Sequence, residues 1–355
     1  MSFLLKPNNV PYNIPRPNNM GLVRYILAFA VIIAHFNILV GGNLYFPISS
    51  YVAVGGFFSL SGFLIYGSYL KKNNFHSYLT SRMIRLLPAY FFIVLACALG
   101  FVFISGHTVH DYFLNPDFWK YLGANITFLN FLQPTLPGVF NGQDIQAVNG
   151  SLWTLKVEWM LYISVPIVVW MVRKFRNHAT QTFVLIYVLS VTYRILFRYL
   201  FDITGEEIYN ILGRQMFGQL TFFYCGVIIY YWFDLFVRYR WYIIAMALIM
   251  FVVSTEQYNI DILLEPIAFS ILVIGLSMTG KWGTWEGKHN NVSYNMYLVH
   301  FPICQLAAWY DFKSLVGEWG CFILVLTTTI LLSVFINYCI EKPIQRAIHN
   351  RLKRI

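Results

Sequence analysis

The sequence has few charged residues. Asp, Glu, Lys and Arg make up 11% of its 355 residues, whereas a soluble globular domain has about 25%. Hydrophobic residues make up 58% and aromatic residues 19% of the chain. This composition argues against an ordinary soluble domain. It predicts an all-α, polytopic membrane protein whose core is a bundle of transmembrane helices in lipid.

Several common chemical motifs are also missing. The five cysteines lie in apolar runs and none belongs to a Cys-x-x-Cys pair, so we expect neither a disulfide framework nor a metal site. The sequence has no Walker loop, no Gly-x-Gly-x-x-Gly pattern and no Gly-x-Ser-x-Gly elbow, which leaves ATP, dinucleotide and serine-hydrolase chemistry without support. Residues 1–20 lack the apolar core of a cleavable signal peptide.

Apolar runs of helical length divide the rest of the chain into about ten predicted spans, each near the ~20 residues needed to cross a bilayer. The runs are 21–40, 51–70, 86–106, 151–171, 181–200, 216–234, 240–255, 262–280, 292–311 and 318–340. We therefore expect a cytoplasmic N-terminal segment (1–20), one transmembrane domain (21–343) and a basic cytoplasmic tail (344–355). No internal repeat is visible.

The distribution of Lys and Arg predicts the orientation. With both termini in the cytoplasm, all but six of the 25 cations fall on the inner side, in agreement with the positive-inside bias. The six on the outer side are Lys120, Lys156, Arg194, Arg198, Arg214 and Lys313. The excess of positive charge thus needs no nucleic-acid partner to explain it.

The predicted outer segment 107–150 is the one long connection, and long connections in compact proteins are usually functional. Its aromatic run from Phe118 to Phe131 predicts a re-entrant or interfacial helix. His107, His110 and Asp111 could suggest a metal site, but no third ligand cluster accompanies them, and a solvated loop is the favoured interpretation.

The first apolar run contains an ionisable pair. Arg24 and His35 are eleven residues apart, about 20° more than three helical turns, so they share one helix face and lie about 16 Å apart along the axis. Ionisable residues inside a span are costly and are candidates for function. A simpler interpretation stays open, in which Arg24 flanks the membrane and His35 makes an interhelical hydrogen bond.

Polar side chains in other runs fall at a similar depth. Counted from the predicted inner edge, His35 lies about 16 Å and His300 about 14 Å into the membrane. Counted from the outer edge, Glu158 lies about 10 Å in, and Ser59 and Ser61 about 12–15 Å in. In a ~30 Å hydrocarbon core these groups form one layer near the midplane or slightly outside it.

A histidine beside a carboxylate suits general base catalysis, because the carboxylate orients the ring and stabilises the imidazolium. We therefore predict His35 and Glu158 as catalytic residues. Non-catalytic interpretations stay open for Glu158 and His300. Glu158 could make a structural hydrogen bond or an ion pair with Lys156 or Arg24, and His300 could be an imidazole satisfied by helix packing.

Cationic residues gather at the predicted inner mouth. Arg82 and Arg85 are one helical turn apart, with Lys71 and Lys72 nearby and Pro88 shortly after. Arginine suits bidentate contacts with phosphate. The alternative interpretation is that these cations only flank the membrane on its inner side, as the positive-inside bias would place them.

Six motifs in order resemble those of the acyltransferase-3 family of membrane acyltransferases. The stretch from Arg24 to His35 resembles the family's Arg-X10-His, and Phe57 to Leu64 resembles its FFxxSGFL. The other matches are Arg82 to Tyr90 (RRxxRLxPxY, with Ser81 at the first Arg), Ser151 to Tyr162 (SLWxLxxExxFY), Ser293 to Pro302 and Glu341 to Pro343. The resemblance covers residues 24–343, nearly the whole chain.

The resemblance implies transfer of an acyl group, usually acetyl, from cytoplasmic acetyl-CoA to a sugar hydroxyl of a surface glycan, in a bacterial inner membrane. We expect no metal, and no appended SGNH esterase-like domain. Arg24, Arg82 and Arg85 would bind the donor, and His35, supported by Glu158, would act as base or transient acyl carrier.

Further residues of this layer are expected to support substrate or structure: Ser59, Ser61, Trp153, Tyr297 and His300. Ser59 and Ser61 lie beside Gly55, Gly56 and Gly62, so close helix packing is favoured over a nucleophilic role. The alternative function is a transporter or exporter of a glycan or lipid-linked sugar, which typically shows structural repeats. A non-catalytic scaffold would leave the polar layer unexplained.

Overall fold

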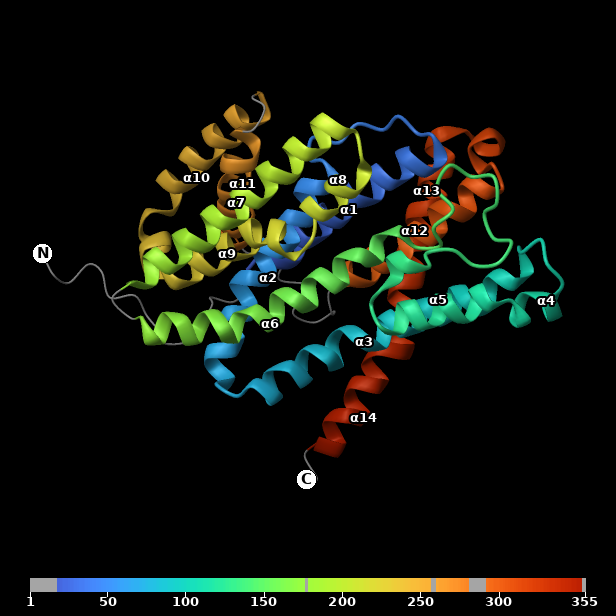
Figure 1. Cartoon of the computed structure of the whole chain (residues 1–355), viewed down its shortest axis with the longest axis horizontal. Helices are drawn as coiled ribbons and strands as arrows, with labels where there is room; N and C mark the ends of the chain where they lie inside the picture. The colour runs from blue at the N-terminus through green and yellow to red at the C-terminus, as the bar shows by residue number, and fades with distance from the viewer. Residues whose placement is uncertain (1–17, 176–177, 257–259, 281–291, 353–355) are drawn as a thin grey trace, which may run out of the picture. The chain divides into compact units, whose positions relative to one another are not determined.

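The computed structural model describes residues 18–175, 178–256, 260–280 and 292–352 (Figure 1). Within these ranges the chain is helical and contains no β-strand, which confirms the all-α prediction. Most of the predicted N-terminal segment (1–17) and the end of the predicted basic tail (353–355) lie outside the described residues, as do the predicted cytoplasmic cations Arg176, Lys281 and Lys288.

The chain divides into two compact units. Unit 1 comprises Met1–Leu27, Tyr51–Leu79 and Val157–Gly287, and unit 2 comprises Ala28–Ser50, Thr80–Lys156 and Lys288–Ile355. Three helices contribute several residues to each unit: α1 (Met20–Val40), α3 (Phe75–Gly100) and α6 (Trp153–Lys174). The helix that begins at Ser50 has only that first residue in unit 2.

The remaining helices of unit 1 are α2 (Ser50–Lys72), α7 (Ala179–Thr204), α8 (Glu207–Gly213), α9 (Met216–Tyr231), α10 (Phe233–Glu256) and α11 (Ile260–Met278). Helix α9 packs against α7 and α11, and α10 packs against α11 (Figure 1).

The remaining helices of unit 2 are α4 (Val109–Leu114), α5 (Pro116–Ile126), α12 (Ser293–Trp309), α13 (Phe312–Phe335) and α14 (Lys342–Leu352). Three short 3-10 helices, η1 (Phe101–Phe103), η2 (Asn130–Leu132) and η3 (Gly150–Leu152), and the π-helical segment η6 (Ile336–Glu341) complete it. Helices α12 and α13 pack side by side.

Eight helices in the described part of the chain are long and apolar enough to cross a membrane, which makes this an integral membrane protein. Two of the ten predicted spans form shorter helices. Helix α9 has 16 residues and α12 has 17, or about 24–26 Å of helix at 1.5 Å per residue. The count of ten spans and the orientation stay predictions.

Two predicted boundaries coincide with breaks inside longer helices. Tyr239 interrupts α10 with non-helical angles (φ −110°, ψ 15°), and the run predicted over 240–255 begins directly after it. Gly317 interrupts α13 with a positive φ of 74°, one residue before the run predicted over 318–340. By contrast, α3 begins at Phe75, eleven residues before the predicted start, because its first three turns are helical but polar.

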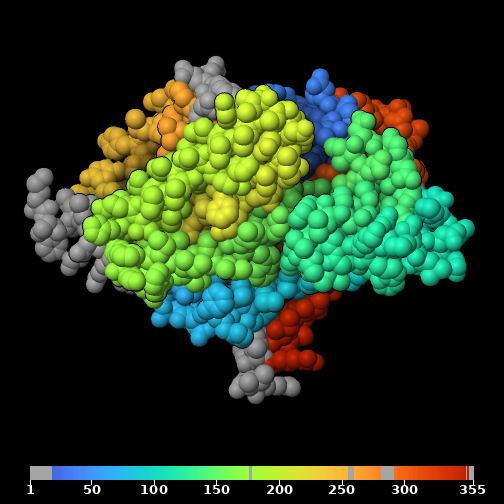
Figure 2. All heavy atoms as spheres, viewed as in Figure 1, coloured from blue at the N-terminus to red at the C-terminus, as the bar shows by residue number. Residues whose placement is uncertain are grey.

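The 107–150 segment is anchored by its own side chains to the helices of unit 2. Tyr112 donates a hydrogen bond to the Ala98 carbonyl (2.8 Å), and Tyr90 of α3 donates one to the Asn125 carbonyl (2.7 Å). Tyr90, Ala98 and Tyr112 belong to one buried hydrophobic core that also contains Tyr121, and Asn125 is buried as well. Figure 2 shows the segment, in teal to green, as a closely packed surface. The aromatic run from Phe118 to Phe131 lies mostly in α5 and η2, so its helical structure is confirmed, and its re-entrant or interfacial placement stays a prediction.

Helices α2 and α9 of unit 1 approach at two glycines. A Cβ atom added to Gly62 would lie 2.0 Å from the Phe223 carbonyl oxygen, and one added to Gly226 would lie 2.0 Å from the Ser59 carbonyl oxygen. The two backbones are therefore in direct contact, the arrangement that small residues allow in membrane helices.

We expect Gly226→Ala to lower the apparent melting temperature of the detergent-purified protein, because the added methyl forces two backbones apart at a cost of about 1–3 kcal/mol. Gly123→Ala in α5 is the matched control, since a Cβ there has no atom within 4 Å. Equal melting temperatures for the two variants would contradict the contact.

Candidate active site

Two histidines meet in unit 2. His35 of α1 and His300 of α12 lie with Nδ1 of His35 2.9 Å from Nε2 of His300. The two ring centroids are 5.0 Å apart, and the Phe301 ring packs edge-on against His35 at 5.1 Å. His300 is fully buried and His35 is partly buried. The sequence predicted both residues in one polar layer without predicting this contact.

The hydrogen bonds of His300 assign the protons on both rings. Its Nδ1 lies 3.1 Å from the Met296 carbonyl oxygen, one turn earlier on α12. A carbonyl can only accept, so Nδ1 of His300 carries the proton, and in the neutral ring Nε2 is the acceptor. Nδ1 of His35 therefore donates to Nε2 of His300. In a neutral His35 ring the remaining nitrogen, Nε2, keeps its lone pair and is the basic atom of the pair.

Hydroxyl groups continue the site from α12 to the start of α6. Tyr297 packs against His300 with ring centroids 5.7 Å apart. Its hydroxyl donates to the Ser151 carbonyl oxygen (3.2 Å) and accepts from the Thr154 hydroxyl (3.0 Å). Tyr297 was predicted as a supporting residue, and this network fixes its ring beside the imidazole.

The turn before α6 is held against α12. Asn149 donates through its side-chain amide to the Leu298 carbonyl oxygen (2.8 Å) and accepts from the Ser151 hydroxyl (2.6 Å). At Gly150 the backbone lies so close to Phe301 that an added Cβ would be 2.7 Å from its ring. Phe301 is in turn the residue that packs on His35, so this turn positions one wall of the histidine site.

Glu158 lies in unit 1 and has a partner on its own helix. Tyr162, one turn later on α6, donates its hydroxyl to Oε1 of Glu158, and Ser61 of α2 donates to the Tyr162 hydroxyl at 3.2 Å. Tyr78 of α3 donates to the Tyr162 carbonyl oxygen (3.0 Å). The structure thus brings Ser61 and Glu158 together through Tyr162. The predicted support of His35 by Glu158 stays a prediction.

The other predicted supporting residues have different surroundings. Ser59 is fully buried and hydrogen-bonds to the Gly55 carbonyl oxygen (2.9 Å) and the Ser270 hydroxyl (2.7 Å), an arrangement typical of helix packing. Trp153 is the first residue of α6 and is partly buried.

The three predicted donor-binding arginines lie on two helices. Arg24 is partly buried on α1, in unit 1. Arg82 and Arg85 lie on α3 in unit 2, where Arg85 is exposed and within electrostatic range of Glu341. Glu341 accepts hydrogen bonds from Asn295 (3.1 Å) and Gln345 (3.0 Å), so a carboxylate held by two amides lies near the predicted cationic mouth.

The histidines of the 107–150 segment have a structural setting. Thr108 caps α4 by accepting from the Asp111 backbone N–H (3.1 Å), and its hydroxyl donates to the Asp111 carboxylate (2.7 Å). This hydrogen bond lowers the pKa of Asp111 below its ordinary value, with a smaller contribution from His110. Within the described ranges, no group of three His, Cys, Asp or Glu side chains could hold a metal ion.

Sequence reasoning missed Asn149, Ser151 and Thr154 as site residues. All three lie in or directly before the Ser151 to Tyr162 motif, which was the one available signal. Their partners on α12 are more than 140 residues away in the chain, and no local pattern indicates which helix lies opposite.

Comparison with known proteins identifies the family. A family model described as an acyltransferase domain, acyltransferase-3, matches residues 18–338. The chain belongs to the acyltransferase-3 family. The match covers both units and includes all the predicted site residues.

Two curated relatives of this acyltransferase-3 chain are similar over part of their length. An O-acetyl transferase of Shigella phage Sf6 is 26% identical over 162 residues, which is 42% of this chain and 44% of the relative. Nodulation protein 10 of Rhizobium leguminosarum bv. viciae is 27% identical over 172 residues, 45% of this chain and 46% of the relative. The similarity therefore spans less than half of each relative. No solved structure matches the chain.

The proton assignment can be measured directly. We expect solid-state NMR of protein with ¹⁵N-labelled histidine, in lipid bilayers near neutral pH, to show His300 with its proton on Nδ1 and an accepting Nε2. In a His35→Ala variant the Nε2 signal of His300 should shift, because it loses its donor. A proton on Nε2 of His300 in the wild-type protein would contradict the assignment.

Proposed function

We propose that this protein is a membrane O-acyltransferase, and specifically an O-acetyltransferase that uses cytoplasmic acetyl-CoA to modify a sugar hydroxyl of an extracytoplasmic glycan. The observation that carries the proposal is the His35–His300 pair, which leaves one basic nitrogen inside a chain of the acyltransferase-3 family. The relatives come from a bacterium and a bacteriophage, which supports a bacterial inner membrane as its location.

In the proposed reaction, Nε2 of His35 takes the proton from the acceptor hydroxyl as that oxygen attacks the thioester carbonyl. The C–O bond forms, the C–S bond breaks, and the departing thiolate of CoA takes up the proton from the imidazolium. In a two-step route the same nitrogen would carry the acyl group. Either route uses the atom that the hydrogen bonds of His300 leave unprotonated.

His300 acts as the positioning residue in this proposal. Its Nε2 accepts from Nδ1 of His35, so it holds the ring in one orientation and stabilises the positive charge that forms on it, the role that a carboxylate has in a Ser-His-Asp triad. The Met296 carbonyl fixes His300 in the tautomer that can accept. A neutral acceptor also avoids placing a full negative charge inside the membrane.

The position of Glu158 on α6 supports a role for this residue in the proposed site. It follows Thr154 by four residues, so the two side chains lie on one face of the helix, and Thr154 donates to Tyr297 in the histidine site. We propose that the Glu158 carboxylate, oriented by Tyr162, orders the acceptor or supports His35.

For the donor, we propose that Arg82 and Arg85, with Arg24, bind the phosphates of acetyl-CoA at the inner mouth. Arginines one turn apart on α3 can form charge-assisted hydrogen bonds with neighbouring phosphate oxygens. The acyl-bearing arm would then reach outward over roughly half of the ~30 Å hydrocarbon core.

We expect His35→Ala to lower the rate of acetyl transfer from labelled acetyl-CoA by at least about 100-fold, since general base catalysis contributes about 10²–10⁴. His300→Ala should lower it by less. The double variant should be no slower than His35→Ala alone, because the two residues act as one unit. His110→Ala removes an exposed side chain of α4, so it is the control and should retain the wild-type rate. A folded His35→Ala protein with wild-type activity would refute the proposal.

The donor site makes a separate prediction. Arg82→Gln and Arg85→Gln should each raise KM for acetyl-CoA by about tenfold, the effect of losing one charge-assisted hydrogen bond. The value of kcat should change little, because the phosphates are remote from the reacting carbonyl. Arg238→Gln, an exposed arginine of α10 on the same predicted side, should leave KM unchanged. A reduced kcat at constant KM would contradict this assignment.

A further inference from the structure

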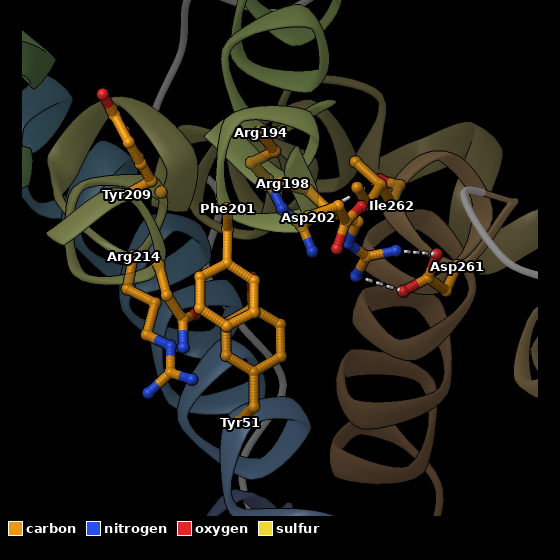
Figure 3. Close-up of a pocket in the computed structure, with 11 residues that line it drawn as sticks. Tyr51, Arg194, Arg198, Phe201, Asp202, Tyr209, Arg214, Asp261 and Ile262 are labelled. Carbon is orange, nitrogen blue, oxygen red and sulfur yellow. Dashed lines mark hydrogen bonds and ion pairs between the residues drawn. The ribbon is translucent and has the colours of Figure 1, made fainter. Parts of the chain in front are cut away.

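Unit 1 contains a pocket of about 420 Å³ at the end of α7 (Figure 3). Residues from the last turns of α7, from α8 and from the first turns of α2 and α11 line it. Three arginines and two aspartates contribute to this lining: Arg194, Arg198, Arg214, Asp202 and Asp261. The pocket therefore carries one more positive than negative side chain.

Arg194 is the most unusual of these residues, because its side chain is charged yet only 6% exposed. Its Nη1 lies 3.4 Å from both the Thr221 hydroxyl and the Ile262 carbonyl oxygen, which is long for a hydrogen bond. Among the described residues, no carboxylate lies within 4 Å of it. A guanidinium has five N–H donors, so most of the hydrogen-bonding capacity of Arg194 is unused. Burying an unpaired charge in a protein interior is costly.

Arg194 itself has no ion pair among the described residues, although carboxylates lie in its neighbourhood. Asp202, two turns later on α7, lines the pocket and adds a negative charge to it. Asp261 is already bound by Arg198 in a bidentate ion pair with distances of 2.8 and 2.7 Å, drawn as dashed lines in Figure 3. Glu265, one turn later on α11, is within electrostatic range of Arg194 but does not line the pocket. A buried cation facing a pocket is thus left with room for an external anion.

Two further features favour an oxyanion in this pocket. Arg214, the C-terminal cap of α8, is exposed and forms no ion pair with the described residues. Tyr51 and Ile262 lie in the first turns of α2 and α11, where unpaired backbone N–H groups and the helix dipole favour negative charge. Arginine side chains bind phosphate through charge-assisted hydrogen bonds.

Aromatic side chains supply the rest of the lining that a ligand would contact. The Tyr51 and Phe201 rings point toward one another in the pocket, whereas the side chain of Tyr209, which also lines it, points away from them (Figure 3). The guanidinium of Arg194 lies over the Tyr51 ring at 5.4 Å, which helps to fix both groups. Flat aromatic faces with a polar edge suit the apolar face of a sugar ring, and pockets that combine them with a few charged groups are typical of small-molecule sites.

We propose that this pocket binds a sugar that carries a phosphate group, with the phosphate at Arg194 and Arg214 and the ring against the aromatic side chains. The Arg198–Asp261 ion pair keeps α7 and α11 in place around the ligand. The site lies wholly within unit 1 and uses none of the residues assigned to acyl transfer.

The test measures binding alone, without an acyl donor, so its outcome is independent of the proposed acyl transfer. The full-length protein in phosphatidylcholine nanodiscs is titrated calorimetrically with glucose 1-phosphate, inorganic phosphate and glucose. We expect saturable binding of glucose 1-phosphate with Kd of roughly 1 mM or tighter, weaker binding of phosphate, and no binding of glucose. Arg214→Ala should weaken glucose 1-phosphate binding by about tenfold or more.

Two controls separate the possible causes. Arg238→Ala removes an exposed arginine of α10 outside the pocket and should bind like the wild type. Nanodiscs that contain phosphatidylglycerol test whether a lipid phosphate occupies the site instead. The proposal is overturned if glucose 1-phosphate does not bind, if it binds no better than glucose, if Arg214→Ala binds equally well, or if phosphatidylglycerol abolishes sugar phosphate binding.

Discussion

A polar group that a helix carries into lipid must find its partner inside the protein, because hydrocarbon offers none. In unit 2 this constraint determines where protons reside. His300 is fully buried beside the Met296 carbonyl oxygen, so its Nδ1 holds a proton and its Nε2 must accept. Nδ1 of His35 therefore donates to Nε2 of His300 across 2.9 Å, and in the neutral His35 ring only Nε2 remains basic. A backbone carbonyl of α12 thereby determines which ring nitrogen of His35 on α1 is left as a hydrogen-bond acceptor.

The layer of polar groups at one depth stays a prediction, but two of its members, His35 and His300, are in contact in the structure. Counting along each helix placed His35 and His300 within about 2 Å of the same depth, and the structure joins them. Depth is a single coordinate, however, and a contact also requires the rotation of each helix and the order of its neighbours. Those depend on packing between distant segments, which explains why the partnership of Thr154 with Tyr297, 143 residues away, was not predictable.

The fold class was predictable because long apolar runs leave few alternatives to membrane-spanning helices. The lengths of individual helices were less predictable than the fold class. Hydropathy reports which residues avoid water, whereas a helix continues wherever its hydrogen bonds do, and α3 therefore begins at Phe75 among polar residues. The opposite error affects α9 and α12, which end sooner than their apolar runs.

The segment 107–150 is secured most firmly where it returns to the helices. Gln305 donates to the carbonyl oxygens of Ile145 and Ala147, and Asn149 binds α12 directly before the site. At Gly142, by contrast, an added Cβ would have no neighbouring atom within 4 Å, although the positive φ of 89° there favours glycine. Surface loops tolerate insertion and exchange where the backbone is not packed. The part of this segment remote from α12 can therefore change in sequence while the hydrogen bonds of Ser151 and Thr154 to Tyr297 persist, so the loop and the candidate site can vary independently.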